Sequence, residues 1–316
     1  GADGALKRTL QPEPAGGATK RRGYLIEKIA DPDNLRLAFW KAARGKRASR
    51  DVRAFAAGLD ENLSRMREQL LQGTLTIGGY RMFRVFEPKE RVIHTAEFAG
   101  RVMHHAVMNV CESDLERAAI DDSYACRRGK GSLAAIARGR SCCDRYGWFL
   151  KMDIRKYFDS IDHGILYGLL ERQFKDRALM DLFGRIIDSY ETTPGKGLPI
   201  GSLTSQHFAN FYLAPLDRFV KETLRCRAYV RYMDDFVVWS HDRESLKEML
   251  PLLERFLAER LALRFKEPPC INRTAQGMDF LGYRLFPGKT RLNRRSKQRF
   301  LRKWRSYMDD FHEGIL

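Results

Sequence analysis

Residues 228–240 read AYVRYMDDFVVWS, and this stretch decides the fold. Two runs rich in β-branched and aromatic residues flank Asp234 and Asp235, and the space between the runs is too short for a helix. The pattern predicts a β-hairpin whose tight turn carries two adjacent carboxylates. Asp is common in turns as a plain polar residue, but two neighbouring carboxylates also suit a hard divalent cation such as Mg²⁺.

The pentapeptide YMDDF occurs a second time, at residues 307–311, in a different setting. There, aromatic residues recur at spacings of four, three and four, which predicts an apolar stripe along a helix. These residues are Phe300, Trp304, Tyr307 and Phe311. The five letters alone therefore do not identify a catalytic site. The first copy gains weight from its hairpin context and from an acidic segment upstream.

That upstream segment, residues 148–154, reads WFLKMDI and is a strand candidate. Alternation places Trp148 on the core face, while Asp153 lies at the strand end on the opposite, non-core face. Asp159 and Asp162 follow closely, and we interpret them as first-turn or capping acids of a helix that begins near residue 163. Asp153 thus has the position expected of a metal ligand.

Three carboxylates, those of Asp153, Asp234 and Asp235, are therefore expected to converge. Together with a polyphosphate they could hold two Mg²⁺ ions, one activating a 3′-hydroxyl and the other stabilising the leaving pyrophosphate. Mn²⁺ is a possible substitute. The arrangement predicts nucleotidyl transfer on a palm-type α+β sheet.

The composition is strongly basic, because the 316 residues carry a formal net charge of +17. This predicts a polyanionic partner, most simply nucleic acid, while a basic protein with no special partner is the plain alternative. Six cysteines show no CxxC or Cys/His ligand spacing, so we expect reduced thiols in a cytoplasmic protein. No apolar run reaches the roughly 20 residues of a membrane helix and no signal peptide opens the chain, so no membrane is expected.

Basic segments recur along the chain. Residues 1–23 are expected to form a flexible basic arm, and residues 41–53 place further cations between two helices. Residues 123–131 combine glycines with three cations, a composition that suits phosphate contact. Residues 289–316 carry nine Lys or Arg against three acids, expected mainly in one helix. The candidate nucleic-acid contacts are Arg127, Arg128, Lys130, Arg294, Arg295, Arg299 and Arg302.

Local patterns predict the remaining elements. Helices are expected within residues 25–71, near 101–110 and at 245–261, and a β-hairpin is expected within 74–93. Lys89 and Arg91 near the far end of that hairpin would point to the same side of a strand, where they could grip a triphosphate.

Four stretches then identify a family. They read FLKMDIRKYFDSIDH, GLPIGSLTSQHFANFYL, YVRYMDDFVV and FLGY, and with this order and spacing the chain resembles reverse transcriptases over about residues 75–290. The resemblance implies an α+β right-hand polymerase, with an antiparallel palm sheet backed by helices. It places the arm at 1–23, mainly fingers at 24–148, mainly palm at 149–288 and a short basic helical thumb at 289–316.

The resemblance also implies roles for single residues. Asp153 and Asp234 would be the principal metal ligands, with Asp235 in support and Ile154 adjoining them. Phe158 would be an aromatic gate that leaves no room for a 2′-hydroxyl and so selects deoxynucleotides. The implied nucleotide-binding residues are Lys89, Arg91, Phe158, Ile200, Gly201, Gln206 and Lys266, and the implied primer grip is Phe280, Leu281, Gly282 and Tyr283.

One departure from the family pattern is informative. Most of the family reads QGxxxSP where residues 200–206 read IGSLTSQ, a form similar to reverse transcriptases of diversity-generating retroelements. This similarity implies errors chiefly at template adenines, a structured template RNA and a small basic accessory variability protein that acts as an oligomer. We hypothesise that Ile200 loosens checking of the nascent pair, because it offers only apolar contact where Gln could hydrogen-bond.

Several alternatives stay open. A group II intron-type enzyme would need a larger thumb and a maturation region after residue 290, and retron, CRISPR-associated or phage-defence enzymes are further rivals. An RNA-templated RNA polymerase would usually carry a polar residue at the gate, which Phe158 is not. A non-catalytic RNA-binding scaffold would have no use for three carboxylates beside bound phosphate. The expected partners are template RNA, a cDNA/RNA–primer duplex and dNTPs, in a bacterial, archaeal or phage-encoded protein.

Overall fold

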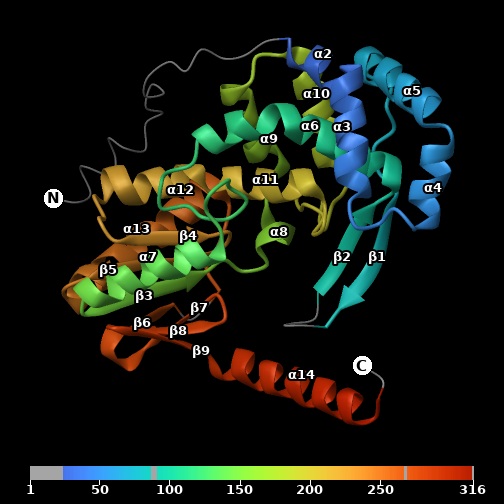
Figure 1. The fold of residues 1–316 in the computed structure, drawn as a ribbon. Coiled ribbons are helices and arrows are strands. Elements are labelled where there is room, and N and C mark those ends of the chain that lie inside the picture. Colours follow the sequence, from blue (N-terminus) through green and yellow to red (C-terminus); the bar gives the residue numbers. More distant parts are fainter. Residues whose placement is uncertain (1–23, 87–90, 267–268, 315–316) are drawn as a thin grey trace.

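The computed structural model describes residues 24–86, 91–266 and 269–314 (Figure 1). A helical part lies above a part built on antiparallel sheets, and the last helix extends along the bottom of the view (Figure 1). The expected basic arm at 1–23 lies outside the described residues. Among the residues described, no helix combines the length and the apolar character needed to cross a membrane.

The helical part is assembled around α6 (Phe98–Arg117), whose apolar residues face α3 (Pro32–Ala43). Helix α3 begins in a predictable way, because the Asp31 side chain accepts from the backbone N–H groups of two first-turn residues. The other helices here are α2 (Leu25–Ile29), α4 (Arg50–Ala57) and α5 (Leu59–Gln72). The expectation of helices within residues 25–71 is confirmed.

A two-stranded antiparallel hairpin descends from this helical part (Figure 1). It pairs β1 (Tyr80–Val85) with β2 (Arg91–Ala96), with Tyr80 opposite Ala96 and Val85 opposite Arg91. The predicted hairpin is therefore confirmed. Its expected triphosphate-gripping residue Lys89 lies outside the described residues.

The central sheet has the strand order β4-β5-β3-β6, with each neighbouring pair antiparallel. Its strands are β3 (Trp148–Asp153), β4 (Tyr229–Tyr232), β5 (Asp235–Ser240) and β6 (Cys270–Arg273). One face joins the main core with α9 (His163–Gln173), α11 (Leu203–Tyr212) and α13 (Arg243–Leu261). Helices thus back the sheet on this face, as expected for a palm.

The opposite face of the sheet is also covered over part of its area. Phe149, Val237 and Trp239 are buried there in a second core, together with residues of α7 (Ser132–Arg145). The expectation that this face lies outside the core is therefore correct only at its Asp153 end, where Asp153 itself is about 40% exposed. The Asp153 carboxylate thus lies at the solvent-exposed end of a sheet face that is otherwise packed.

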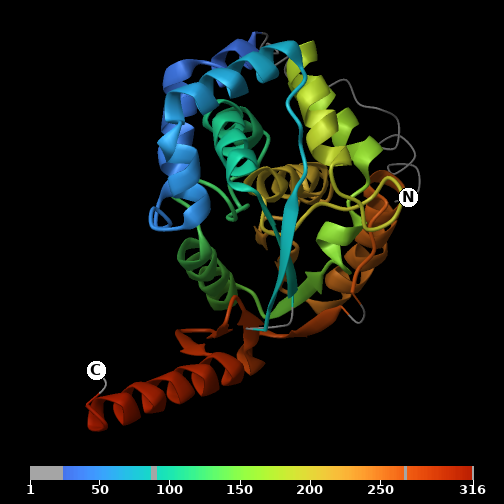
Figure 2. The same cartoon turned by 90° about the vertical axis from the view of Figure 1, so that its right-hand side faces the viewer.

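A second antiparallel sheet, β7-β8-β9, adjoins α7 and leads into the last helix. Its strands are β7 (Met278–Phe280), β8 (Tyr283–Phe286) and β9 (Lys289–Leu292), followed by α14 (Arg294–His312). Helix α14 has no buried residue and projects away from the rest of the molecule (Figure 2). Residues 289–292, expected as the start of a helical thumb, instead form a strand.

The remaining short elements connect these units. They are α8 (Tyr157–Ser160), α10 (Arg177–Asp188), α12 (Ala214–Arg218), the π-helical turn η1 (Phe219–Thr223) and the 3-10 turn η2 (Thr274–Gln276). Asp162 caps α9 by accepting from the backbone N–H of Ile165 at 3.0 Å, so its predicted capping role is confirmed.

Candidate polymerase active site

The turn between β4 and β5 carries the acidic pair. Tyr232 pairs with Asp235, which leaves Met233 and Asp234 as the two residues of the turn. Met233 has a positive φ of 57°, a left-handed conformation that a non-glycine residue seldom adopts. The predicted hairpin is confirmed, with Asp234 in the turn and Asp235 as the first residue of β5.

Strand pairing brings Asp153 to this turn. Asp153 stands directly opposite Asp235 in the β3–β5 register, and residues opposite each other project from the same face of a sheet. The Asp153 and Asp234 side chains lie near enough for the charge of Asp153 to act on Asp234. Burial, reinforced by the charge of Asp153, raises the pKa of Asp234 to about 6. The fold therefore crowds carboxylates from two distant segments.

Two lysines flank the carboxylates. Lys151 Nζ lies 3.3 Å from Asp235 Oδ2 and also donates to the carbonyl oxygen of Asp279 at 2.6 Å, just before the predicted primer grip. On the other side, Lys266 Nζ lies 4.0 Å from Asp153 Oδ2, and its backbone N–H donates to the Asp153 carbonyl at 2.8 Å. The negative charge of the site is thus partly balanced from both sides.

The fit of a metal ion can be tested on this geometry. In the described ranges, no group of three or more His, Cys, Asp and Glu side chains is arranged to hold a metal ion. The Asp153–Asp234 pair still has suitable chemistry, because carboxylate oxygens are the ligands of Mg²⁺ and a cation between them would relieve the repulsion that raises the pKa of Asp234. The hydrocarbon side chain of Ile154 has no ligand atom, so only its backbone carbonyl could contribute.

The candidate gate Phe158 is held from the neighbouring loop. Its carbonyl accepts the backbone N–H of Leu198 at 2.9 Å, which ties the segment after β3 to the loop before α11. Tyr157 beside it is buried and donates its hydroxyl to the Ala209 carbonyl. Phe158 itself is partly buried against the main core. The structure thereby fixes the backbone of this segment relative to α11.

The loop with the unusual Ile200 and Gly201 lies against the β1–β2 hairpin. The Ile200 carbonyl accepts the backbone N–H of His94 on β2 at 2.7 Å. Gly201 has φ +113°, and a Cβ there would lie 2.7 Å from Ile93 Cγ2 and 3.1 Å from the His94 carbonyl oxygen. Only glycine permits this close approach. Gln206, also predicted to bind nucleotide, is exposed on α11.

A buried histidine braces the same loop from α6. His104 Nδ1 lies 3.0 Å from Thr204 Oγ1, and its Nε2 lies 3.4 Å from the Ser202 hydroxyl. Burial lowers the pKa of His104 to about 4, so the ring is neutral at physiological pH and can bond both hydroxyls without a buried charge. The start of α11 is therefore locked to α6.

The predicted phosphate contacts at residues 127–130 have unequal surroundings. Arg127 is largely buried and donates to Glu116 and to the carbonyls of Ile120 and Ser123. Lys130 donates to Asp121 at 2.6 Å. Arg128, by contrast, has a side chain that is 82% exposed. Arg127 therefore supports the local fold, whereas Arg128 presents its charge to solvent.

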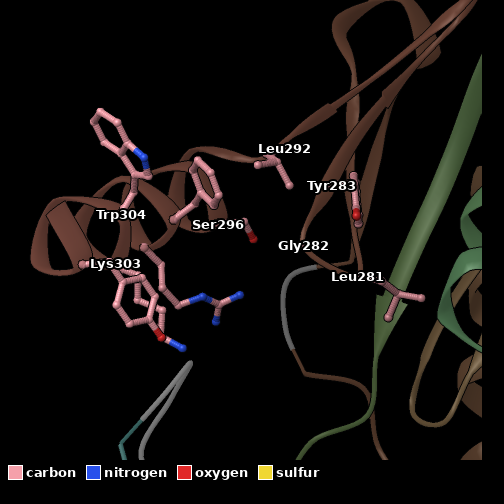
Figure 3. Close-up of a pocket in the computed structure, with 10 residues that line it drawn as sticks. Leu281, Gly282, Tyr283, Leu292, Ser296, Lys303 and Trp304 are labelled. Atoms are coloured by element: carbon pink, nitrogen blue, oxygen red, sulfur yellow. The ribbon is translucent and has the colours of Figure 1, made fainter. Parts of the chain in front are cut away.

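A cavity of about 420 Å³ separates the β7–β8 turn from α14 (Figure 3). Leu281 and Gly282 form this turn with φ values of 48° and 87°, while Phe280 is buried beneath it. Figure 3 shows Leu281, Gly282 and Tyr283 on one side and Lys303 and Trp304 of α14 on the other. The aromatic stripe predicted on this helix is confirmed as helical, and Phe300, Trp304, Tyr307 and Phe311 are all more than half exposed.

The cations of α14 surround this stripe. Arg294, Arg295 and Arg302 are exposed, and Arg299 lines the cavity. Aromatic rings among cations form a surface on which the bases of a nucleic-acid strand can stack while its phosphates pair with the cations. Leu281, Gly282 and Tyr283 of the predicted primer grip therefore line the same hollow as the predicted basic helix, whereas the buried Phe280 does not.

Residue patterns alone missed two charged groups of the site. Lys151 shares a strand face with Asp153, and a lysine two residues before a carboxylate was the available signal. Arg231 is completely buried on β4, two residues before Met233 of the turn, and a charged residue inside an apolar strand was its signal.

Comparisons with known proteins agree with this architecture. The E. coli protein YkfC is 24% identical over 277 residues, covering 71% of this chain and 72% of that protein. The group II intron-encoded protein LtrA of Lactococcus lactis subsp. cremoris is 24% identical over 212 residues, covering 62% of this chain and 35% of LtrA. The putative COX1/OXI3 intron 2 protein of Saccharomyces cerevisiae is 24% identical over 274 residues, covering 66% of this chain and 31% of that protein. The chain thus spans about a third of the length of the two intron proteins.

A solved structure and a family model complete the comparison. Telomerase from Candida albicans, in complex with a TWJ fragment of telomeric RNA, superposes with a TM-score of 0.50 at 13% identity, covering 69% of this chain and 45% of that chain. This likeness supports the expected α+β right-hand fold. A family model described as reverse transcriptase (RNA-dependent DNA polymerase) matches residues 87–285, which is more than half of the chain. The chain belongs to the reverse transcriptase family.

Proposed function

We propose that this chain is an RNA-directed DNA polymerase that extends a primer on a template RNA, using dNTPs. The observation that carries the proposal is the clustering of three carboxylates, with Asp235 directly opposite Asp153 and the buried Asp234 within reach of the Asp153 charge. Membership of the reverse transcriptase family supports it. Two Mg²⁺ ions, or Mn²⁺ in their place, would when bound activate the primer 3′-hydroxyl and stabilise the leaving pyrophosphate.

The protein residues then have separate tasks. Asp153 and Asp234 would hold the metal, Asp235 would support them, and the Ile154 backbone would add an oxygen. Lys266, 4.0 Å from Asp153, would stand at the pyrophosphate side and lend a positive charge. Phe158 would press against the sugar and exclude a 2′-hydroxyl. Lys89, Arg91, Ile200, Gly201 and Gln206 would complete the nucleotide site.

The nucleic acid would lie between the helical part and α14. Phe280, Leu281, Gly282 and Tyr283 would grip the primer, and Arg128, Arg294, Arg295, Arg299 and Arg302 would contact phosphates. We assign mainly fingers to residues 24–148 and mainly palm to 149–288. Because β9 continues the palm's second sheet, the thumb begins with α14.

The test is primer extension by the purified protein on a primed four-base RNA, with Mg²⁺ and dNTPs. Asp234→Asn should abolish extension. The matched control is Asp309→Asn, which makes the same change in the second YMDDF copy, on an exposed position of α14. Equal loss in both variants, or unchanged extension by Asp234→Asn, would contradict the assigned site. Because the wild type could fail to extend the primer when a required partner is missing, the assay is repeated with the native RNA and accessory protein.

Within this function, we infer the diversity-generating type, with misincorporation chiefly at template adenines and a small basic accessory oligomer as partner. The support is the IGSLTSQ stretch, whose Ile200 is anchored on β2 by its carbonyl. Ile200→Gln should reduce errors at adenines, whereas Leu133→Gln, on an exposed position of α7, should not. An unchanged error spectrum in Ile200→Gln removes this role of Ile200.

A group II intron-type activity is the second candidate, because LtrA is among the similar proteins. Sequencing of the cDNA separates the two candidates. Faithful copying by the wild type favours the intron type, and errors massed at adenines favour the diversity-generating type.

A further inference from the structure

A completely buried arginine lies directly beneath the acidic turn. Arg231 on β4 is 0% exposed, as is its partner Asp217 on α12. Its Nε and Nη2 donate to the two carboxylate oxygens of Asp217 at 2.7 and 2.6 Å. Burial alone would lower the pKa of the guanidinium, but the charge of Asp217 outweighs this and raises it. Arg231 is therefore charged and held by a two-pronged ion pair.

The remaining N–H groups of Arg231 bind two further segments. Nη1 donates to Asn210 Oδ1 at 2.8 Å and to the Met233 carbonyl at 3.1 Å, and Nη2 also donates to the Asn210 carbonyl at 3.3 Å. An arginine side chain has five N–H donors, so every one of them is used. The guanidinium thus connects α11, α12 and the turn.

The contact with Met233 is the one that concerns the active site. Met233 has the left-handed φ of 57°, and its carbonyl belongs to the peptide unit that enters Asp234. A strained turn persists only where its surroundings impose it. A rigid donor aimed at this carbonyl limits rotation of that peptide unit and hence the position of the Asp234 carboxylate.

Stability alone does not account for such a cluster. A buried ion pair can often be replaced by well-packed apolar residues without loss of stability. An apolar side chain at position 231 could fill the same space, but it could not bond the Met233 carbonyl. The feature specific to arginine is that one planar group is anchored by Asp217 and Asn210 and still reaches the turn.

We propose that Arg231 is a positioning residue that, anchored by Asp217 and Asn210, fixes the Met233 peptide and so sets Asp234 against Asp153 for metal binding. This role deepens the proposed function and rests on it. It predicts that loosening the guanidinium weakens metal binding more than loss of fold stability explains.

The test compares Arg231→Lys with Tyr229→Phe. Lysine keeps the charge but loses the planar fork, so it cannot hold Asp217 and the Met233 carbonyl together. Tyr229→Phe removes a neighbouring hydrogen bond, from the Tyr229 hydroxyl to Asp217 Oδ1 at 2.7 Å, and leaves the contact with Met233 in place. Both changes disturb the same buried cluster, but only the first reaches the turn.

Mn²⁺ binding to the full chain, loaded with a primer–template duplex, is measured by electron paramagnetic resonance alongside the melting temperature. Arg231→Lys should raise the Kd for Mn²⁺ about tenfold and raise the Mg²⁺ concentration for half-maximal extension similarly. Tyr229→Phe should leave both within about twofold of the wild type, even where it melts earlier. If Arg231→Lys does not fold, the Asn210→Ala variant is used instead, because this change removes the acceptor of one Nη1 N–H group. A rise in the Kd for Mn²⁺ of about threefold is then expected.

Three outcomes count against the proposal. The proposal is overturned if Arg231→Lys folds and binds Mn²⁺ with wild-type affinity, or if Asn210→Ala, used in its place, does so. It is also overturned if the Kd for Mn²⁺ rises in proportion to the loss of melting temperature in both compared variants. The proposed function itself fails separately, if the wild type binds Mn²⁺ no better than Asp234→Asn and does not extend the primer. In that case the positioning role falls with it.

Discussion

Asp153 stands directly opposite Asp235 in the β3–β5 pairing, which brings its carboxylate near that of Asp234 in the turn just before β5. Burial of Asp234, reinforced by the nearby charge of Asp153, raises the pKa of Asp234 to about 6 from an ordinary value of 3.8. The native state therefore holds the charged form of Asp234 at a cost. If the proposed cation binds here, it would offset this cost by lying beside the charged carboxylates.

The first prediction follows from the sign of this shift. Because the pKa is higher in the native than in the unfolded state, the contribution of Asp234 to stability is fully present below about pH 4 and is lost as pH rises through about 6. Asp234→Asn should therefore stabilise the metal-free protein at pH 7.5 by about 1–3 kcal/mol, or roughly 2–8 °C in melting temperature.

The measurement is thermal unfolding in a chelator at pH 7.5 and pH 5, taken as variant minus wild type so that other titrating groups cancel. The stabilisation should shrink toward pH 5, and Asp309→Asn should show none at either pH. A destabilised Asp234→Asn at pH 7.5 would mean that the carboxylate pair is not strained in the native state.

The second prediction concerns the link between the proposed catalytic carboxylates and the proposed primer grip. Lys151 joins Asp235 to the Asp279 carbonyl, and an apolar side chain at this position of β3 could make neither contact. Lys151→Met should lower primer-extension efficiency by about three- to tenfold, through an increased KM for primer–template. The efficiency loss corresponds to about 0.7–1.4 kcal/mol.

Steady-state kinetics with varied duplex and fixed dNTPs checks this expectation. Lys247→Met is the control, because Lys247 forms only an exposed pair with Glu244 on α13. A drop in kcat with unchanged KM would place the role of Lys151 at the carboxylates alone and not at the primer grip.

Much of this site can be predicted from the sequence, because its strands and turn are encoded locally. Alternation around Asp153 and the paired apolar runs around Asp234 predict the strand end and the turn. The β3–β5 register, which places Asp153 opposite Asp235, depends on long-range packing of both sheet faces. Local patterns could not supply it.

The errors have the same physical origin. Lys289–Leu292 resembles the start of a basic helix, but pairing with β8 makes it a strand, because tertiary contacts override a weak local preference. Arg127 reads as a phosphate contact, yet its guanidinium is used by Glu116 and by backbone carbonyls. Whether a cationic side chain faces solvent depends on the tertiary contacts around it. The spacing of residues in the sequence does not encode these contacts.

The third prediction concerns the joint between α2 and α10. The Asp176 carboxylate is buried and accepts the backbone N–H groups of Leu25 and Ile26, at 2.5 and 3.0 Å, and also that of Leu179 at 3.1 Å. One side chain therefore caps both α2 and α10. Asp176→Ala should destabilise the protein by about 2–4 kcal/mol, because each lost cap costs about 1 kcal/mol and the donors remain buried.

Chemical denaturation measures this loss, with Asp31→Ala as the matched control. Asp31 is an exposed cap of α3 alone, so its removal should cost only about 1 kcal/mol. Equal losses in the two variants would show that the double cap adds nothing to the joint.

The last prediction tests the close approach between the Ile200–Gly201 loop and the β1–β2 hairpin. Gly201 and Gly195 both have positive φ, at +113° and +70°, but only a Cβ at Gly201 would collide with β2, because Gly195 has no atom within 4 Å. Gly195→Ala should therefore cost about 1 kcal/mol from backbone strain alone. Gly201→Ala should cost about 1–3 kcal/mol more and should push the loop away from His94.

Since the loop borders the proposed nucleotide site, only Gly201→Ala should raise the KM for dNTPs, by about tenfold in primer extension. Equal KM values in the two variants would separate this loop from nucleotide binding.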